Sequence, residues 1–251
     1  MPGVTATIIT RNESAHIDAC LASVAWADER LVVDSGSTDD TVARARAAGA
    51  RVIERHWPGY GAQKNFAAAE AAHDWILSID ADERVTPNLS AELKRRLANP
   101  GDAAGFRVPR VTWYLGRWIW TTDWYPDHQL RLYDRRRARW VERLVHESVH
   151  ADGPVVTLKD DLQHYAYRDI AHHIDTMNWY TTLAAQQMFD EGRRAGALDL
   201  LLHPPAAFLR NFVLRRGFLD GSVGFTISAL NAHYVRLKFA KLRELERTRT
   251  P

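Results

Sequence analysis

Short apolar runs alternate with helical periodicity over the first 98 residues of the chain. The apolar runs predict β-strands at 4–10, 30–33, 50–53 and 74–79, and helical patterns follow them at 14–24, 41–48, 62–72 and 90–98. Parallel neighbours in a sheet are joined by right-handed crossovers that usually contain a helix. The alternation therefore predicts an α/β fold with a mostly parallel sheet flanked by helices.

The pattern changes after residue 98. Strand-like segments at 105–113, 129–133 and 140–158 surround a loop at 113–125 that is rich in tryptophan and tyrosine. Helical patterns then dominate to the end of the chain. We therefore expect an α/β core over residues 1–165 and a helical C-terminal extension over 166–251.

Composition restricts the class of protein. The chain has 251 residues, of which 46% are hydrophobic and 25% charged, as expected for a globular protein. The single cysteine, Cys20, excludes an intrachain disulfide and a cysteine-based zinc site. We find neither a signal-peptide pattern nor an apolar run of about 18 residues, so a cytoplasmic protein is expected.

Charge is distributed unevenly. Residues 198–251 contain nine Lys and Arg against four Asp and Glu, whereas the rest of the chain has a small acidic excess. The basic part mixes apolar residues with Arg210, Arg215 and Arg216, which indicates a surface on an anionic membrane. Core helices with an ordinary solvated face are the alternative, and no recognised nucleic-acid motif accompanies the charge.

Polar clusters follow three of the predicted strands at their carboxyl ends: 12–13, 34–40 and 80–83. In α/β sheets ligands bind beyond these ends, so the three clusters are expected to converge on one site. Asp80 and Asp82 form an Asp-x-Asp pair, which suits Mg²⁺ or Mn²⁺ with substrate phosphate oxygens. A polar turn before the next helix is the simpler alternative.

Several motifs together resemble the signature of family 2 inverting glycosyltransferases with the GT-A fold. They are Ala6-Thr-Ile-Ile-Thr-Arg-Asn-Glu13, Val33-Asp-Ser-Gly-Ser-Thr-Asp-Asp-Thr41, Gly59-Tyr-Gly-Ala-Gln-Lys-Asn65 and Asp80-Ala-Asp-Glu83. The segments 131–133, 146–147, 164–165 and 218–225 are similar to the branch that includes lipopolysaccharide inner-core β-glucosyltransferases. The resemblance covers about the first 165 residues in order.

The resemblance implies a nucleotide-sugar site, with UDP-glucose as the expected donor. Asp82 and His164 are the implied ligands of Mn²⁺ or Mg²⁺, and Asp80 is implied to contact the ribose or the metal through water. Glu83 either orients its neighbours or begins a helix. The full set of implied donor-binding residues is Thr10, Asn12, Glu13, Asp34, Gly36, Lys64, Asp80 and Ala81.

Simpler explanations exist for several of these residues. Asp34 and Gly36 also suit a turn that caps the following helix. Glu13 also suits a helix start, and Lys64 a solvated position on an exposed helix face. His164 alone would be an ordinary structural histidine.

An inverting transfer needs a general base that removes the acceptor hydroxyl proton. Glu147 corresponds in order to the catalytic carboxylate of the family, and Asp127 is the second candidate. Glu147 could instead pair with Arg131 or Arg143. The aromatic loop at 113–125 suits either a saccharide acceptor or a lid or membrane anchor.

These observations predict a metal-dependent enzyme that transfers a hexose to a lipid-linked glycan or a lipopolysaccharide core, peripheral on the inner face of the cytoplasmic membrane. A polyprenyl phosphate or protein acceptor is the nearest alternative, and a non-catalytic nucleotide-sugar or glycan-binding protein is another. A nucleotidyltransferase would need a glycine-rich phosphate loop after the first strand, and Thr10-Arg-Asn-Glu13 does not provide one.

Overall fold

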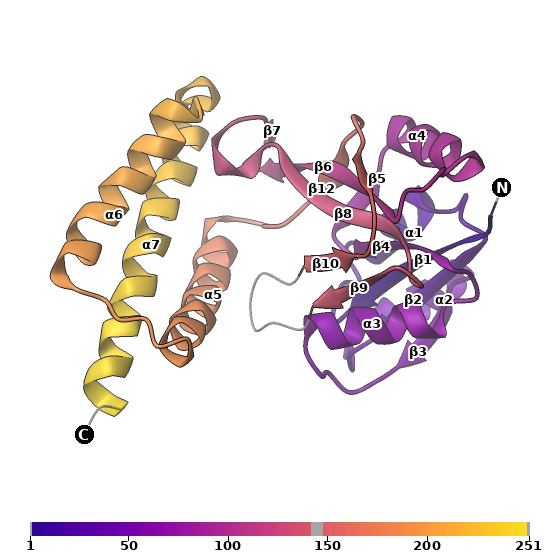
Figure 1. Ribbon diagram of the computed structural model, residues 1–251, viewed down its shortest axis with the longest axis horizontal. Helices are drawn as coiled ribbons and strands as arrows, with labels where there is room; N and C mark the ends of the chain where they lie inside the picture. The colour runs from indigo at the N-terminus through magenta and orange to yellow at the C-terminus, as the bar shows by residue number, and fades with distance from the viewer. Residues whose placement is uncertain (1, 142–147, 250–251) are drawn as a thin grey trace. The chain divides into compact units, whose positions relative to one another are not determined.

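The computed structural model describes residues 2–141 and 148–249 (Figure 1). The chain divides into two compact units. The sheet unit contains the described residues of 2–110, 127–141 and 148–164, and the helical unit contains residues 111–126 and 165–249. The division is not a single cut near residue 165, because the aromatic segment 111–126 groups with the C-terminal helices.

Twelve strands occur in the described residues. They are β1 (Val4–Thr10), β2 (Glu29–Asp34), β3 (Arg51–Glu54), β4 (Trp75–Asp80), β5 (Glu83–Val85), β6 (Gly105–Tyr114), β7 (Arg117–Ile119), β8 (Asp127–Asp134), β9 (Ala138–Val141), β10 (Ser148–Ala151), β11 (Val155–Thr157) and β12 (Leu162–His164). The main sheet has the order β3-β2-β1-β4-β8-β6-β12-β5, with β7 and β11 also paired to β6, while β9 and β10 form a separate pair.

The sheet is mixed, and its two halves follow different rules. The strands β3, β2, β1 and β4 are parallel, as the alternating pattern predicts. By contrast, β8 is antiparallel to both β4 and β6. In the described residues between α4 and α5 no α-helix separates successive strands, so most of these strands pair antiparallel. The exception is β11, which is parallel to β6.

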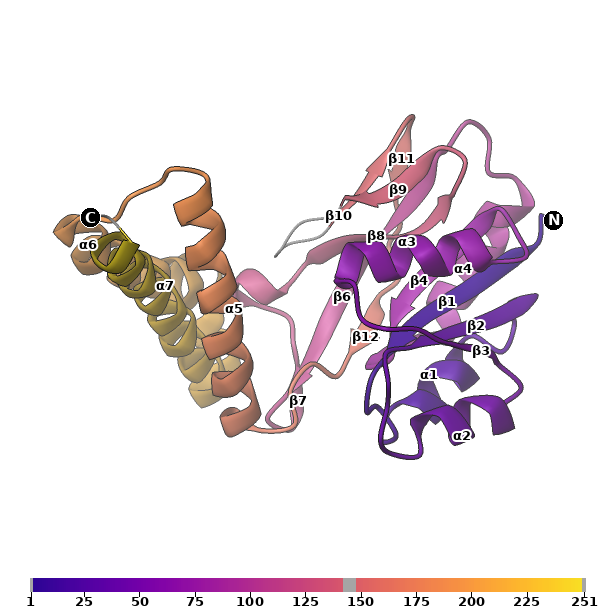
Figure 2. The ribbon, with the colours of Figure 1, turned by 90° about the horizontal axis from the view of Figure 1, so that it is seen from below.

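Four helices belong to the sheet unit: α1 (Ile17–Ser23), α2 (Thr41–Ala47), α3 (Tyr60–Glu70) and α4 (Pro87–Ala98). Figure 2 shows α3 on one side of the sheet and α1 and α2 on the other. The side chains of β1 alternate between these faces as strand geometry requires, since Ile8 joins the core of α1 and α4 and Ile9 joins the core of α3. The two cores hold the strand ends in place.

The helical unit is built on α5 (Ile170–Asp190), α6 (Ala197–Leu209) and α7 (Gly221–Arg249), and both α5 and α6 pack against α7. Between α6 and α7 lie a π-helix (Arg210–Leu214) and a 3₁₀-helix (Gly217–Asp220), and a further 3₁₀-helix spans Thr122–Trp124. Tyr114, Ile119 and Ile227 form a core that joins the aromatic segment to α7. No helix within 2–141 or 148–249 has both the length and the apolarity for crossing a membrane.

Candidate functional site

The strand register brings the three predicted polar clusters to one edge of the sheet. Thr10, the last residue of β1, lies opposite Asp34, the last residue of β2. On the other side of β1, Ile9 lies opposite Asp80 at the end of β4. Since these strands are parallel, the loops that follow them leave the sheet at the same edge. The convergence expected from the sequence is therefore present.

Asp34 organises the loop after β2. Its carboxylate accepts hydrogen bonds from the backbone N–H of Gly36 (2.9 Å) and of Ser37 (2.8 Å), and the Ser37 hydroxyl donates to it as well. Gly36 has φ +81°, a conformation that glycine adopts without strain. Asp34 therefore forms the expected turn, but it does not cap α2, whose N-cap residue is Asp40. A contact of Asp34 with the nucleotide stays a prediction.

Asn12 ties the loop after β1 to the loop after β2. Its backbone N–H donates to the Ser37 hydroxyl at 2.8 Å, and its side-chain oxygen accepts from the Thr38 N–H at 2.8 Å. The backbone of Asn12 has φ +56°, a left-handed conformation that asparagine tolerates better than most residues. The two loops therefore form one connected wall beside the strand ends.

Glu13 lies between this wall and the carboxylates after β4. It precedes α1, which begins at Ile17, and its backbone N–H donates to the Thr41 hydroxyl at 2.8 Å. Burial, reinforced by the negative charges of Asp82 and Asp39, raises the pKa of Glu13 to about 7. Burial is the larger cause of this shift, and the two aspartates add negative charge close to Glu13.

Asp80 is held between two cations. Lys64 Nζ lies 2.9 Å from one carboxylate oxygen and Arg131 Nη2 lies 2.8 Å from the other. Burial of Asp80 opposes its ionisation, but the two cations outweigh that effect and lower its pKa. The Lys64 side chain is only 4% exposed and its Nζ lies 4.3 Å from the centre of the Trp140 ring, so the solvated position is wrong.

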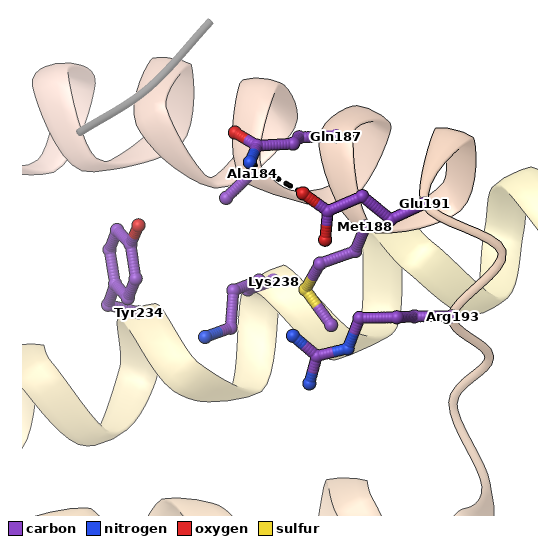
Figure 3. A pocket seen from close by; sticks show the side chains of 7 residues that line it. All are labelled: Ala184, Gln187, Met188, Glu191, Arg193, Tyr234 and Lys238. Atoms are coloured by element: carbon purple, nitrogen blue, oxygen red, sulfur yellow. Dashed lines mark hydrogen bonds between the residues drawn. The ribbon is translucent and has the colours of Figure 1, made fainter. Parts of the chain in front are cut away.

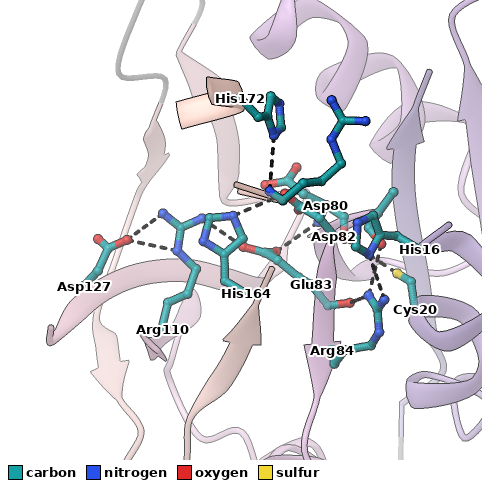
Figure 4. A network of polar contacts seen from close by, with 12 residues as sticks. His16, Cys20, Asp80, Asp82, Glu83, Arg84, Arg110, Asp127, His164 and His172 are labelled. Atoms are coloured by element: carbon teal, nitrogen blue, oxygen red, sulfur yellow. Dashed lines mark hydrogen bonds and ion pairs between the residues drawn. The ribbon is translucent and has the colours of Figure 1, made fainter. Parts of the chain in front are cut away.

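Glu83 is fully buried and orients its neighbours (Figure 4). It accepts from Arg110 Nη1 at 3.0 Å and from Arg131 Nη2 at 2.5 Å, and its other oxygen accepts from the Asp80 N–H at 2.9 Å. Glu83 lies in β5, whereas α4 begins at Pro87, so the helix-start alternative is wrong. The carboxylate instead fixes the turn that presents Asp80 and Asp82.

Asp82 and His164 lie side by side. Strand β12 pairs with β5 so that His164 is opposite Glu83, and His164 Nε2 lies 3.3 Å from Asp82 Oδ2. Burial opposes the ionisation of Asp82, but the neighbouring His164 outweighs it and lowers the Asp82 pKa. Both side chains are partly exposed.

This pair fits a divalent cation. Two ligand atoms about 2.1 Å from one ion and at right angles to each other are about 3 Å apart, close to the observed separation. Within the residues that the structure describes, no group of three His, Cys, Asp or Glu forms a closed metal site. An ion held by Asp82 and His164 would therefore complete its coordination with water and phosphate oxygens.

Of the two candidate bases, Asp127 lies within the described residues. Asp127 accepts from Arg110 Nε at 2.9 Å and Nη2 at 2.6 Å, and also from Gln129 at 2.7 Å. Burial opposes the ionisation of Asp127, but Arg110 outweighs it and lowers the pKa, which weakens this carboxylate as a proton acceptor. Glu147 lies outside the described residues, as does its alternative pairing with Arg143.

The remaining predicted donor residues are buried at the strand ends. The Thr10 hydroxyl is buried and has no hydrogen-bond partner in the described part of the chain. Ala81 is buried, and its carbonyl accepts from Arg84 Nη1 at 3.2 Å. These residues shape the floor of the site.

Sequence reasoning missed Arg110 and assigned Arg131 only a pairing with Glu147. Both arginines have apolar neighbours along the strand: Arg110 in β6 lies between Pro109 and Val111, and Arg131 in β8 lies between Leu130 and Leu132. A charged residue within a buried strand needs a buried partner of opposite charge. The position of the two arginines in the sequence therefore predicts a carboxylate partner for each. It does not identify that partner as Glu83, which is distant along the chain.

A hollow lies within the helical unit. It has a volume of about 180 Å³ between α5 and α7, and its lining includes Glu191, Arg193, Tyr234 and Lys238 (Figure 3). Glu191 accepts a hydrogen bond from Gln187 at 2.8 Å. This cavity holds neither an aspartate nor a histidine and differs in chemistry from the strand-end site.

The fold and site define an α/β protein with a cluster of charged groups at the carboxyl edge of its parallel strands. The family profile for Glycosyl transferase family 2 matches residues 5–153, more than half of the chain. The chain therefore belongs to glycosyl transferase family 2. This membership and the observed sheet with its helical extension confirm the fold class expected from the sequence.

Two relatives match nearly the whole chain. One is a lipopolysaccharide core biosynthesis glycosyltransferase, LpsC, of Rhizobium meliloti, which is 32% identical over 95% of this chain and 91% of its own length. The other is an uncharacterized glycosyltransferase of Rickettsia typhi, 32% identical over 98% of this chain and 88% of its own length.

A more distant likeness is found among solved structures. The glucosyl-3-phosphoglycerate synthase of Mycobacterium tuberculosis, crystallised with Mn²⁺, UDP-glucose and phosphoglyceric acid, is 28% identical with a TM-score of 0.39. The match covers 43% of this chain and 44% of that one.

Proposed function

We propose that this glycosyltransferase transfers glucose from UDP-glucose with inversion, and that Mn²⁺ or Mg²⁺ assists the transfer. The observation that carries the proposal is the pair of Asp82 and His164, 3.3 Å apart at the edge where the loops after β1, β2 and β4 meet. A carboxylate and an imidazole suit Mn²⁺ better than Mg²⁺, because imidazole is a softer ligand than oxygen.

The donor would lie along the strand ends. Asp34 and Gly36 form a turn, and the hydrogen bonds of Asn12 join this turn to the loop after β1. Together they form a polar wall suited to the nucleoside. Asp80 keeps Lys64 within 2.9 Å, so this cation is held close to the proposed diphosphate position. When bound, the divalent ion would stabilise the charge that develops on the leaving diphosphate.

In an inverting transfer the acceptor hydroxyl attacks the sugar from the face opposite the leaving diphosphate. A base on that face must therefore remove the hydroxyl proton. We assign this role to Glu147, since Arg110 lowers the pKa of Asp127 and donates two hydrogen bonds to one of its carboxylate oxygens. Asp127 would then position the Arg110–Glu83 part of the network rather than accept a proton. If the acceptor is a polyprenyl phosphate, no strong base is needed and Glu147 should be dispensable.

A lipid-linked glycan or lipopolysaccharide core is the proposed acceptor. The support is the similarity to the Rhizobium meliloti protein, whose name places it in lipopolysaccharide core biosynthesis, over most of both chains. A protein acceptor is the alternative. Assays with glycan and protein acceptors would distinguish the two.

The test is a screen of UDP-, GDP- and dTDP-sugars with Mn²⁺, read by thermal shift and by donor turnover. A donor that binds the native state raises the unfolding temperature by mass action. UDP-glucose should give the largest shift, and Asp82→Asn should abolish the metal-dependent part of it. Asp18→Asn is the matched control, since Asp18 makes an exposed ion pair with Arg44. If another donor alone is turned over, the UDP-glucose assignment fails, and if Asp82→Asn retains full metal-dependent activity, the metal assignment fails.

A further inference from the structure

The connection between α6 and α7 exposes an unusual amount of apolar surface. We call residues 208–225 the helical tip. Six of its large apolar side chains are half or more exposed, with Leu214 the most exposed at 76%: Leu209, Val213, Leu214, Phe218, Leu219 and Phe225. Single exposed apolar residues are ordinary, but a group of this size on one short segment marks an interaction surface.

Ring contacts connect the four phenylalanines of the tip, two of which belong to the exposed group. Phe212 stacks on Phe208 with ring centres 5.4 Å apart, and it meets Phe225 at 5.8 Å and Phe218 at 6.4 Å. The four rings come from α6, the π-helix, the 3₁₀-helix and α7, so they join all parts of the tip. The exposed leucines are neighbours of these rings along the chain.

Close backbone packing holds the tip in shape. A Cβ atom on Gly224 would lie 1.8 Å from the Gly217 carbonyl oxygen, so only glycine permits this approach. The buried Asp220 pairs with Arg117 at 3.0 Å and accepts from the Thr121 hydroxyl at 2.5 Å. The apolar side chains are therefore presented by a braced turn, which keeps them from folding back into the core.

The tip also carries positive charge among its apolar side chains. It contains Arg210, Arg215 and Arg216 against the single acid Asp220, which is buried, for a formal charge of +2. Arg210 and Arg215 approach Asp123, and all three arginines are exposed. Apolar side chains interleaved with arginine are typical of segments that lie in the interface of an anionic bilayer.

We propose that the helical tip inserts its apolar side chains into the headgroup region of an anionic phospholipid bilayer. A second copy of this chain suits the surface less well. In a symmetric dimer the same patch faces itself, so the arginines of one tip would oppose those of the other. Anionic headgroups, by contrast, are opposite in sign to the net positive charge of the tip.

Flotation with phospholipid vesicles tests this proposal on the full chain. The protein should float with phosphatidylcholine vesicles that contain about 30% phosphatidylglycerol, and should bind much more weakly to phosphatidylcholine alone. The double variant Leu214→Gln with Leu219→Gln should weaken binding at least tenfold. Arg216→Gln should weaken it by about fivefold, as expected for one basic residue near an anionic surface.

The matched control is the double variant Ile170→Gln with Ile174→Gln, which removes two exposed apolar side chains from α5. It should bind vesicles like the unchanged protein. The proposal is overturned if the unchanged protein does not float, or if the tip and control variants bind equally. It is also overturned if light scattering shows a dimer that the tip variant dissociates. Vesicle binding needs neither donor nor metal, so its outcome is independent of the proposed transfer reaction.

Discussion

Replacing Arg131 by methionine tests whether the buried charge network holds the strand-end carboxylates. Arg131 is buried and bridges Asp80 at 2.8 Å and Glu83 at 2.5 Å. Methionine fills a similar volume but removes the charge. Among the described residues, Asp80 would keep Lys64, while the fully buried Glu83 would keep Arg110 and the Asp80 N–H.

The expected cost follows from this count of partners. Breaking a buried ion pair by removing one member costs about 3–5 kcal/mol, because the remaining charge is left buried. Since Glu83 retains one cation, we expect the lower end, about 3 kcal/mol. For a chain of this size that lowers the unfolding temperature by roughly 6–12 °C.

The assay is thermal unfolding followed by circular dichroism, with Arg44→Met as the control. Arg44 and its partner Asp18 are both about half exposed, so this change should cost less than about 1 kcal/mol. Adding Glu83→Gln to Arg131→Met should recover part of the loss, because it removes the stranded charge. Equal costs for Arg131→Met and Arg44→Met, or purely additive losses in the double variant, would refute the reasoning.

Three further predictions concern pH, packing and catalysis. Burial, with the neighbouring His172 charge, lowers the pKa of His173 to about 4, so the unfolded chain binds more protons than the folded one between about pH 6.5 and 4. His173 should therefore contribute a loss of about 3 kcal/mol of stability as the pH drops through that window. In urea titrations the unfolding free energy of His173→Gln should fall less over this window than that of the unchanged protein. Gly224→Ala should lower the midpoint of urea unfolding clearly, because the added Cβ would meet the backbone of Gly217. Gly196→Ala is the control and should be nearly neutral, because its Cβ would meet no atom closer than 3.6 Å. Equal midpoints for the two variants would contradict the packing argument. Glu147→Gln should reduce kcat at least a hundredfold in steady-state assays and leave the KM for the donor little changed. Asp127→Asn should reduce kcat less. If Asp127→Asn instead has the larger effect on kcat, Asp127 and not Glu147 is the base.

The charge network has a consequence for how the site tolerates change. Arg110 links Glu83 to Asp127, and Arg131 links Glu83 to Asp80. The buried carboxylate of Glu83 therefore connects Asp80 and Asp127. Residues that share a network couple energetically. Substitutions at Glu83 should therefore disturb Asp80 and Asp127 together, even though Glu83 itself is inaccessible.

The sequence alone determined the four parallel strands of the first half of the chain, the helices that follow them and the sheet edge at which the polar clusters meet, but not strand β5. Strand periodicity, helix periodicity and the polar clusters after each strand are local properties, and the carboxyl ends of parallel strands must share an edge. These local properties therefore suffice to assign Asp34, Asp80 and Asp82 to one site. The register of β1 with β2 and β4 agrees with this assignment.

Only the tertiary structure decided the partners of these residues. The burial of Lys64 against Trp140, the bridge of Arg110 and Arg131 through Glu83, and the mixed second half of the sheet all depend on contacts between distant parts of the chain. Sequence pattern records which residues are apolar or charged, but not which ones meet. The pairing of buried charges is selected by three-dimensional packing, because each charge needs an opposite one within a few ångströms and the chain offers many candidates.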